Sequence, residues 1–226
     1  MESLSRMKGI PANVFVCAFA FGNLAFATDT IPKSKIDGWT FFNRSLDFEM
    51  QKRNYIPTSQ HNETLCVTAA FKQSDNGPHN ITKVFFYRNL SSTDWPIANI
   101  TMKFVSTTNT TRYNTVKSSI TVALHGYSLP APHWRFLYVE ENCTVVKVLS
   151  SKISPVQRMA QKKQSPHISK YCELWAVQRH HWRSESYKAA NASSLCEKAF
   201  SSMCENTTIY TVWESQYCGP KSINKS

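Results

Sequence analysis

The chain has 226 residues, of which 42% are hydrophobic, and a formal net charge of +11 at pH 7. Its length suits a single domain, and all-β barrels often reach this size. Such a charge would suggest nucleic acid as a partner in a cytosolic protein, whereas in a secreted one it suggests acidic glycans, membrane surfaces or nothing specific.

The first 27 residues are typical of a signal peptide. Arg6 and Lys8 give it a positive start, the apolar run from residue 14 is too short to span a membrane, and Ala25-Phe26-Ala27 matches a cleavage site. No later apolar run approaches the ~20 residues of a membrane helix. We therefore expect a secreted protein with one domain over residues 28–226, no membrane span and no nucleic-acid partner.

Six cysteines remain after the signal peptide. An even number in a secreted chain predicts three disulfides, and the spacing alone leaves their pairing open. No C-x-x-C or H-x-x-x-H spacing occurs, so we expect no metal site. The six are Cys66, Cys143, Cys172, Cys196, Cys204 and Cys218.

Ten N-x-S/T sequons occur along the chain, which predicts a heavily glycosylated surface. Dense sugar leaves little outer face for tight protein contacts, so it favours an interior site and a monomer. We expect glycans on Asn43, Asn62, Asn80, Asn89, Asn99, Asn109, Asn142, Asn191 and Asn206, whereas Asn224 lies close to the C-terminus.

Residues 28–45 are mostly polar and contain a local aromatic cluster of Trp39, Phe41 and Phe42. The pair Asp37-Gly38 indicates a turn or a helix start just before this cluster. We expect a short N-terminal helix that closes one end of the fold with these aromatic side chains.

From residue 46 onward, the chain reads as short strands separated by turn residues. Alternating faces in antiparallel strands predict an all-β up-and-down barrel, and a barrel of eight strands has room for one small ligand. The expected strands are residues 46–54, 64–73, 80–88, 99–107, 113–124, 134–140, 143–149 and 172–180.

Two segments break this pattern. Residues 150–171 form a basic insertion without any acidic residue, and we expect it to be either a site for an anionic glycan or a solvated loop. Residues 191–204 read as a helix with Leu195, Ala199 and Phe200 as its apolar stripe, and we expect it to pack outside the barrel.

The sequence does not predict an enzyme. No G-x-S-x-G, H-E-x-x-H or phosphate-binding loop occurs, and all six cysteines are expected to pair. His180 and His181 are adjacent, so on a strand they face opposite ways and cannot bind one metal ion together. We expect no catalytic residue and no cofactor.

Several short motifs follow one another along the chain in this order: Asp37-Gly38-Trp39, Cys66, Asn142-Cys143-Thr144-Val145, Glu173-Leu174-Trp175, Cys196 with Phe200, and Cys218. In this order they resemble a tick salivary lipocalin of the histamine-binding type. The resemblance implies a closed lipocalin barrel with disulfides from Cys66 to Cys218 and from Cys143 to Cys196. Cys172 is then left for Cys204.

The resemblance also implies a function. It suggests a protein that sequesters a host mediator, either a biogenic amine such as histamine or a lipid mediator, and so suppresses host defence. The alternative is an immunomodulatory lipocalin that binds a host protein or cell surface, with cholesterol, a fatty ligand or nothing in the barrel.

Glu173 and Trp175 lie two residues apart in the last expected strand, so we expect both to face the cavity. Glu173 either holds an amine or is a structural acid paired with an interior Lys, Arg or Tyr. The amine motif is incomplete, because Thr144 stands where the resemblance implies Asp and residues 55–60 contain no carboxylate. The other expected lining residues are Phe48, Tyr55, Phe71, Phe86, Phe104 and Phe136.

Overall fold

The computed structural model of the chain describes residues 34, 36–57, 64–72, 77–106, 111–149, 170–178, 191–205 and 208–218. All of them belong to one unit, which runs from Ile31 to Ser226. No helix within these ranges is long and apolar enough to cross a membrane. The expected signal peptide, residues 150–169 of the basic insertion, and four sequon asparagines (Asn62, Asn109, Asn206 and Asn224) lie outside the described residues.

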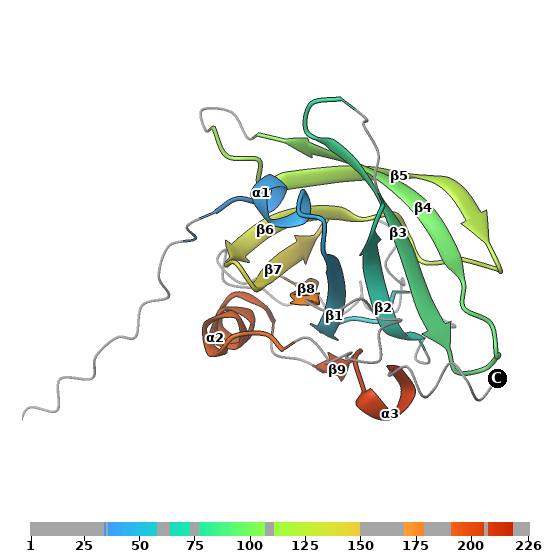
Figure 1. The fold of residues 1–226 in the computed structure, drawn as a ribbon. Helices are drawn as coiled ribbons and strands as arrows, with labels where there is room; N and C mark the ends of the chain where they lie inside the picture. The colour runs from blue at the N-terminus through green and yellow to red at the C-terminus, as the bar shows by residue number, and fades with distance from the viewer. Residues whose placement is uncertain are drawn as a thin grey trace, which may run out of the picture. The chain divides into compact units, whose positions relative to one another are not determined.

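Eight antiparallel strands form a closed barrel (Figure 1). They are β1 (Asp47–Arg53), β2 (Thr64–Phe71), β3 (Asn80–Asn89), β4 (Ile97–Val105), β5 (Thr115–Leu124), β6 (His133–Val139), β7 (Cys143–Val148) and β8 (Cys172–Gln178). Successive strands from β2 to β8 pair with each other, and β1 pairs with both β8 and β2, which closes the circle. The expected eight-stranded up-and-down barrel is confirmed, and every strand overlaps its predicted range.

Helix α1 (Gly38–Phe42) plugs one end of the barrel, as the sequence predicts. Its N-cap is Asp37, whose carboxylate accepts a hydrogen bond from the Thr40 N–H at 2.8 Å. Phe41 and Phe42 are fully buried and pack against Phe48 at the start of β1, with ring centroids 5.0 and 4.6 Å away. Aromatic packing therefore fixes the helix to the barrel.

Gly38 allows α1 to approach β6 closely, because a Cβ atom at this position would lie 2.1 Å from Cε2 of Phe136. We expect Gly38→Ala to lower the free energy of unfolding by about 1–3 kcal/mol through overpacking, measured by urea denaturation. In a Phe136→Leu background the smaller side chain leaves room, so the same substitution should be less harmful. If Gly38→Ala lowered the free energy of unfolding equally in the wild type and in Phe136→Leu, the result would contradict a close contact between Gly38 and Phe136.

Helix α2 (Ser194–Met203) packs outside the barrel against β7 and β8. Disulfides from Cys143 to Cys196 and from Cys172 to Cys204 tie both halves of the helix region to those strands. The predicted apolar stripe was wrong in one member, because Leu195 is 38% exposed and the neighbouring half-cystine Cys196 is fully buried in its place.

The C-terminal tail completes the wall between β1 and β2. The first half of β1 pairs with β2 directly, whereas Lys52 and Arg53 pair with the short strand β9 (Tyr210–Thr211). On the other side, the Cys66 N–H donates to the carbonyl of Val212 at 2.8 Å. Helix α3 (Ser215–Cys218) follows, and the disulfide from Cys66 to Cys218 holds this inserted tail in place.

Two irregularities change which side chains face inward. In β2 the register shifts between Leu65 and Thr68, where Cys66 has a φ of 57°. Leu65 consequently lies with Cys66 in a cluster under the tail, outside the barrel core. In β6 the register shifts between Phe136 and Tyr138, and Tyr138 joins the cluster beneath α2.

Candidate functional site

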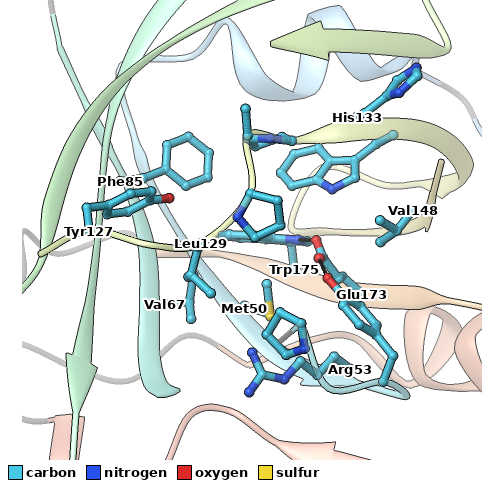
Figure 2. Close-up of a pocket in the computed structure, with 16 residues that line it drawn as sticks. Met50, Arg53, Val67, Phe85, Tyr127, Leu129, His133, Val148, Glu173 and Trp175 are labelled. Atoms are coloured by element: carbon cyan, nitrogen blue, oxygen red, sulfur yellow. Dashed lines mark hydrogen bonds between the residues drawn. The ribbon is translucent and has the colours of Figure 1, made fainter. Parts of the chain in front are cut away.

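A cavity lies inside the barrel near the C-terminal end of β1 (Figure 2). Its empty space, counted together with the open solvent at its mouth, is about 450 Å³. Strands β1, β2, β3, β6, β7 and β8 and the loop from β5 to β6 contribute to its wall. The lining residues are Met50, Arg53, Tyr55, Pro57, Val67, Phe85, Tyr127, Leu129, Pro130, Ala131, Pro132, His133, Trp134, Val148, Glu173 and Trp175.

Glu173 is the acidic group of this lining and is 4% exposed. Its Oε1 accepts a hydrogen bond from the Tyr55 hydroxyl, and its Oε2 accepts one from Nε1 of Trp175 at 2.8 Å. Figure 2 shows the carboxylate beside the indole of Trp175. Burial raises the pKa of the Glu173 carboxyl, while the two hydrogen bonds and the nearby Arg53 guanidinium oppose that rise. Both carboxylate oxygens are thus held by side chains of the barrel itself.

Arg53 brings a positive charge to the same wall and is 3% exposed. Its Nη2 donates to the carbonyl of Thr64 at 3.3 Å. Burial lowers the pKa of Arg53, whereas the neighbouring Tyr55 and Glu173 favour its charged form. A ligand near Glu173 therefore meets a carboxylate and a guanidinium together, and the electrostatic field of one partly cancels that of the other.

The loop from β5 to β6 forms a further wall that sequence reasoning missed. Tyr127 packs on Tyr87 of β3 with ring centroids 5.5 Å apart, and the Tyr87 hydroxyl lies 3.0 Å from Oγ of Ser128. Burial raises the pKa of Tyr127, so it stays a neutral phenol. Pro130 and Pro132 restrict the backbone that follows. These two prolines were the signal in the sequence that this loop has a defined conformation.

The predicted ligand-binding residues do not form one group. Tyr55, Glu173 and Trp175 lie together in the cavity wall. Phe104 and Phe136 instead stack on each other, with ring centroids 6.1 Å apart, and both approach Phe42 of α1. Phe48 also contacts α1, so these three phenylalanines belong to the packing that holds the plug.

Two predicted lining residues do not face the cavity. Phe71, at the end of β2, is 43% exposed. Phe86 packs against Trp95 at a centroid distance of 6.0 Å, and its neighbour Phe85 lines the cavity. Residues 84–87 are apolar on both faces, so alternation could not decide between the two phenylalanines. In the structure Phe85 faces the barrel interior, and Phe86 lies on the outer face, where Trp95 covers it.

Lys83 is a buried cation at the plugged end of the barrel, with 1% of its surface exposed. Its Nζ donates to the carbonyls of Arg44 at 3.0 Å and Leu46 at 3.1 Å. It also lies 4.7 Å from the centroid of the Phe48 ring. Burial lowers the pKa of Lys83 to about 7. These contacts join β3 to the segment between α1 and β1, and they lie outside the cavity lining.

One cluster in the described part of the chain combines metal-ligand residue types: Glu140, Cys143 and Cys196. The two cysteines share a disulfide, which leaves no thiolate for a metal ion. Glu140 accepts hydrogen bonds from the hydroxyls of Tyr138 and Ser193. Ser193 is the N-cap of α2. We interpret the cluster as the anchor of α2.

The described sequon asparagines differ in exposure. Asn43, Asn142 and Asn191 are exposed, whereas Asn80, Asn89 and Asn99 are half-buried on β3 and β4. Glycosylation at these positions stays a prediction.

Comparison with known proteins gives a family. The family model for tick histamine binding protein matches residues 28–220. No curated relative matches the sequence at a significant level. Among solved structures, Japanin from Rhipicephalus appendiculatus bound to cholesterol is similar, with 9% sequence identity, a TM-score of 0.44, and coverage of 75% of this chain and 93% of that chain. Because the family match spans most of its length, the chain belongs to the tick histamine binding protein family.

Proposed function

We propose that this protein is secreted in saliva and captures a small host mediator in its barrel, one ligand per chain and without turnover. The family is named for the binding of a small ligand and not for catalysis. The predicted signal peptide and the three disulfides support secretion. The cavity inside the barrel supports this proposal as a place where such a ligand can be held.

We infer further that an amphipathic lipid suits this cavity better than a cationic amine. The observation that carries this inference is that both oxygens of Glu173 already accept hydrogen bonds, from Tyr55 and Trp175. A bound ammonium would have to share this carboxylate, and it would add a second positive charge near Arg53. Apolar side chains such as Val67 supply much of the remaining wall and suit a hydrocarbon ligand.

Isothermal titration calorimetry against histamine, serotonin, a leukotriene and cholesterol tests this function. We expect a lipid to bind with a negative heat-capacity change, because apolar surface is buried. Glu173→Gln should leave lipid affinity nearly unchanged, whereas an amine paired with the carboxylate would lose at least about tenfold in affinity.

Two leucines provide a matched control for the location of the site. Leu129→Ala removes part of the cavity wall and should weaken lipid binding, whereas Leu124→Ala changes a side chain that is 52% exposed on β5 and should not. Histamine binding that disappears in Glu173→Gln would reverse the preference for a lipid. Binding of none of the four ligands by folded glycoprotein would contradict sequestration and favour recognition of a host protein or cell surface.

A further inference from the structure

The outer face of β3, β4 and β5 carries apolar side chains where a barrel in water normally carries polar ones. Two neighbouring cross-strand rows form this outer apolar block: Phe86, Ile97 and Leu124 in one, and Val84, Asn99 and Val122 in the other. Asn99 is the single polar residue among the six.

Part of the block is open to solvent. Val122 is 43% exposed and Leu124 is 52% exposed, whereas Phe86 is covered by Trp95. Single apolar residues scattered on a surface need no explanation, whereas a contiguous exposed group is a site for interaction or aggregation.

The same part of β5 is also a free edge within the described structure. Strand β6 pairs with Thr115, Val116 and Lys117, and no described strand pairs with residues 118–124 on that side. Figure 1 shows β5 running on past β6. Residues 118–124 contain neither a charged residue nor a proline. An edge without charges or prolines invites pairing with another chain, and natural proteins protect such edges.

The sequence around Asn99 offers a protecting group. Asn99-Ile100-Thr101 is a sequon, and the asparagine lies directly between Val84 and Val122 in its row. Side chains opposite each other in an antiparallel sheet have Cβ atoms about 4.5–5.5 Å apart. A sugar attached to Nδ2 of Asn99 would therefore begin between two valines, where an apolar face of its ring can lie over them.

We propose that Asn99 is N-glycosylated, and that this glycan covers the outer apolar block and keeps the edge of β5 from pairing with a second chain. The proposal rests on the secretory route in the proposed function. The donor is a lipid-linked oligosaccharide diphosphate. Nδ2 of Asn99 forms the bond to the anomeric carbon, the bond from that carbon to the diphosphate oxygen breaks, and the diphosphate leaves with the electron pair while the amide gives up one proton.

The test uses the full chain secreted from insect cells. Glycopeptide mass spectrometry reports occupancy at Asn99 and at Asn191, an exposed sequon before α2. Light scattering coupled to size exclusion reports self-association. Asn99→Gln and Thr101→Ala should both lose the monomer peak, whereas Thr101→Ser, which keeps the sequon, and Asn191→Gln should retain it. Adding Val122→Thr and Leu124→Lys to Asn99→Gln should restore the monomer.

Occupied Asn191 with unmodified Asn99 would overturn the proposal and leave the proposed function untouched. A glycosylated Asn99 whose Gln variant stays monomeric would overturn the protective role. Unmodified asparagine at both positions would overturn the proposal together with the secretory premise. Ligand titration of the Asn99→Gln variant separates this site from the cavity, because its affinity should equal that of the wild type.

Discussion

Replacing both Cys66 and Cys218 with serine is expected to lower the free energy of unfolding by about 5 kcal/mol. The disulfide joins residues 152 positions apart, and in the chain-entropy model its contribution grows with the loop that it closes. It also holds β9 between β1 and β2, next to Arg53 and the cavity. Urea denaturation of the variant and the wild type measures the loss.

The other two disulfides are the matched controls. They close separations of 53 and 32 residues, so their serine variants should each lose about 4 kcal/mol. The backbone amides of residues 66 and 212 bond the tail to its neighbours. Hydrogen exchange at these two amides should be faster in the variant that lacks the disulfide from Cys66 to Cys218, and not in the two control variants. Slow exchange there after loss of the tether would show that strand pairing alone holds the tail.

Glu173→Leu is expected to lower the free energy of unfolding by about 3–5 kcal/mol, measured by urea denaturation at pH 7. The substitution leaves the Tyr55 hydroxyl and the Trp175 indole N–H without their acceptor in a buried site. It also removes the carboxylate that favours the charged form of Arg53. Unmatched buried polar groups of this kind are among the largest sources of mutational destabilisation.

Two further variants separate the contributions to this loss. Glu173→Gln keeps an acceptor oxygen for Trp175, so its loss should be about 1 kcal/mol. Adding Arg53→Met to Glu173→Leu should recover part of the stability, because the buried charge is removed with its partner. Losses that simply add would show that Arg53 and Glu173 are not coupled.

Together with the calorimetry, these variants distinguish two roles of Glu173. If the carboxylate mainly stabilises the fold, Glu173→Leu strongly lowers the free energy of unfolding, and Glu173→Gln leaves the lipid affinity unchanged. If the carboxylate mainly binds an amine ligand, Glu173→Gln lowers the affinity for that amine. The geometry favours the first role, because the hydrogen bonds of both oxygens come from the barrel.

Local sequence patterns determined the barrel and its plug. Short apolar segments bounded by turn residues predict the eight strands, and most of these segments also alternate with a period of two, because a strand half-buried against a core must alternate. The pair Asp37-Gly38 before three aromatic residues likewise predicts α1. The disulfide partners implied by the family resemblance are the three pairs in the structure.

Only the tertiary structure decided which side chains line the cavity. Alternation is a local rule, so it cannot choose between Phe85 and Phe86, and it fails beyond the register shift between Phe136 and Tyr138. Strand register and contacts between distant segments also determine three further features. These are the part of the cavity wall that comes from the loop after β5, the position of β9 between β1 and β2, and the apolar rows around Asn99. Those contacts form only when the barrel closes, which is why the sequence pattern alone does not contain them.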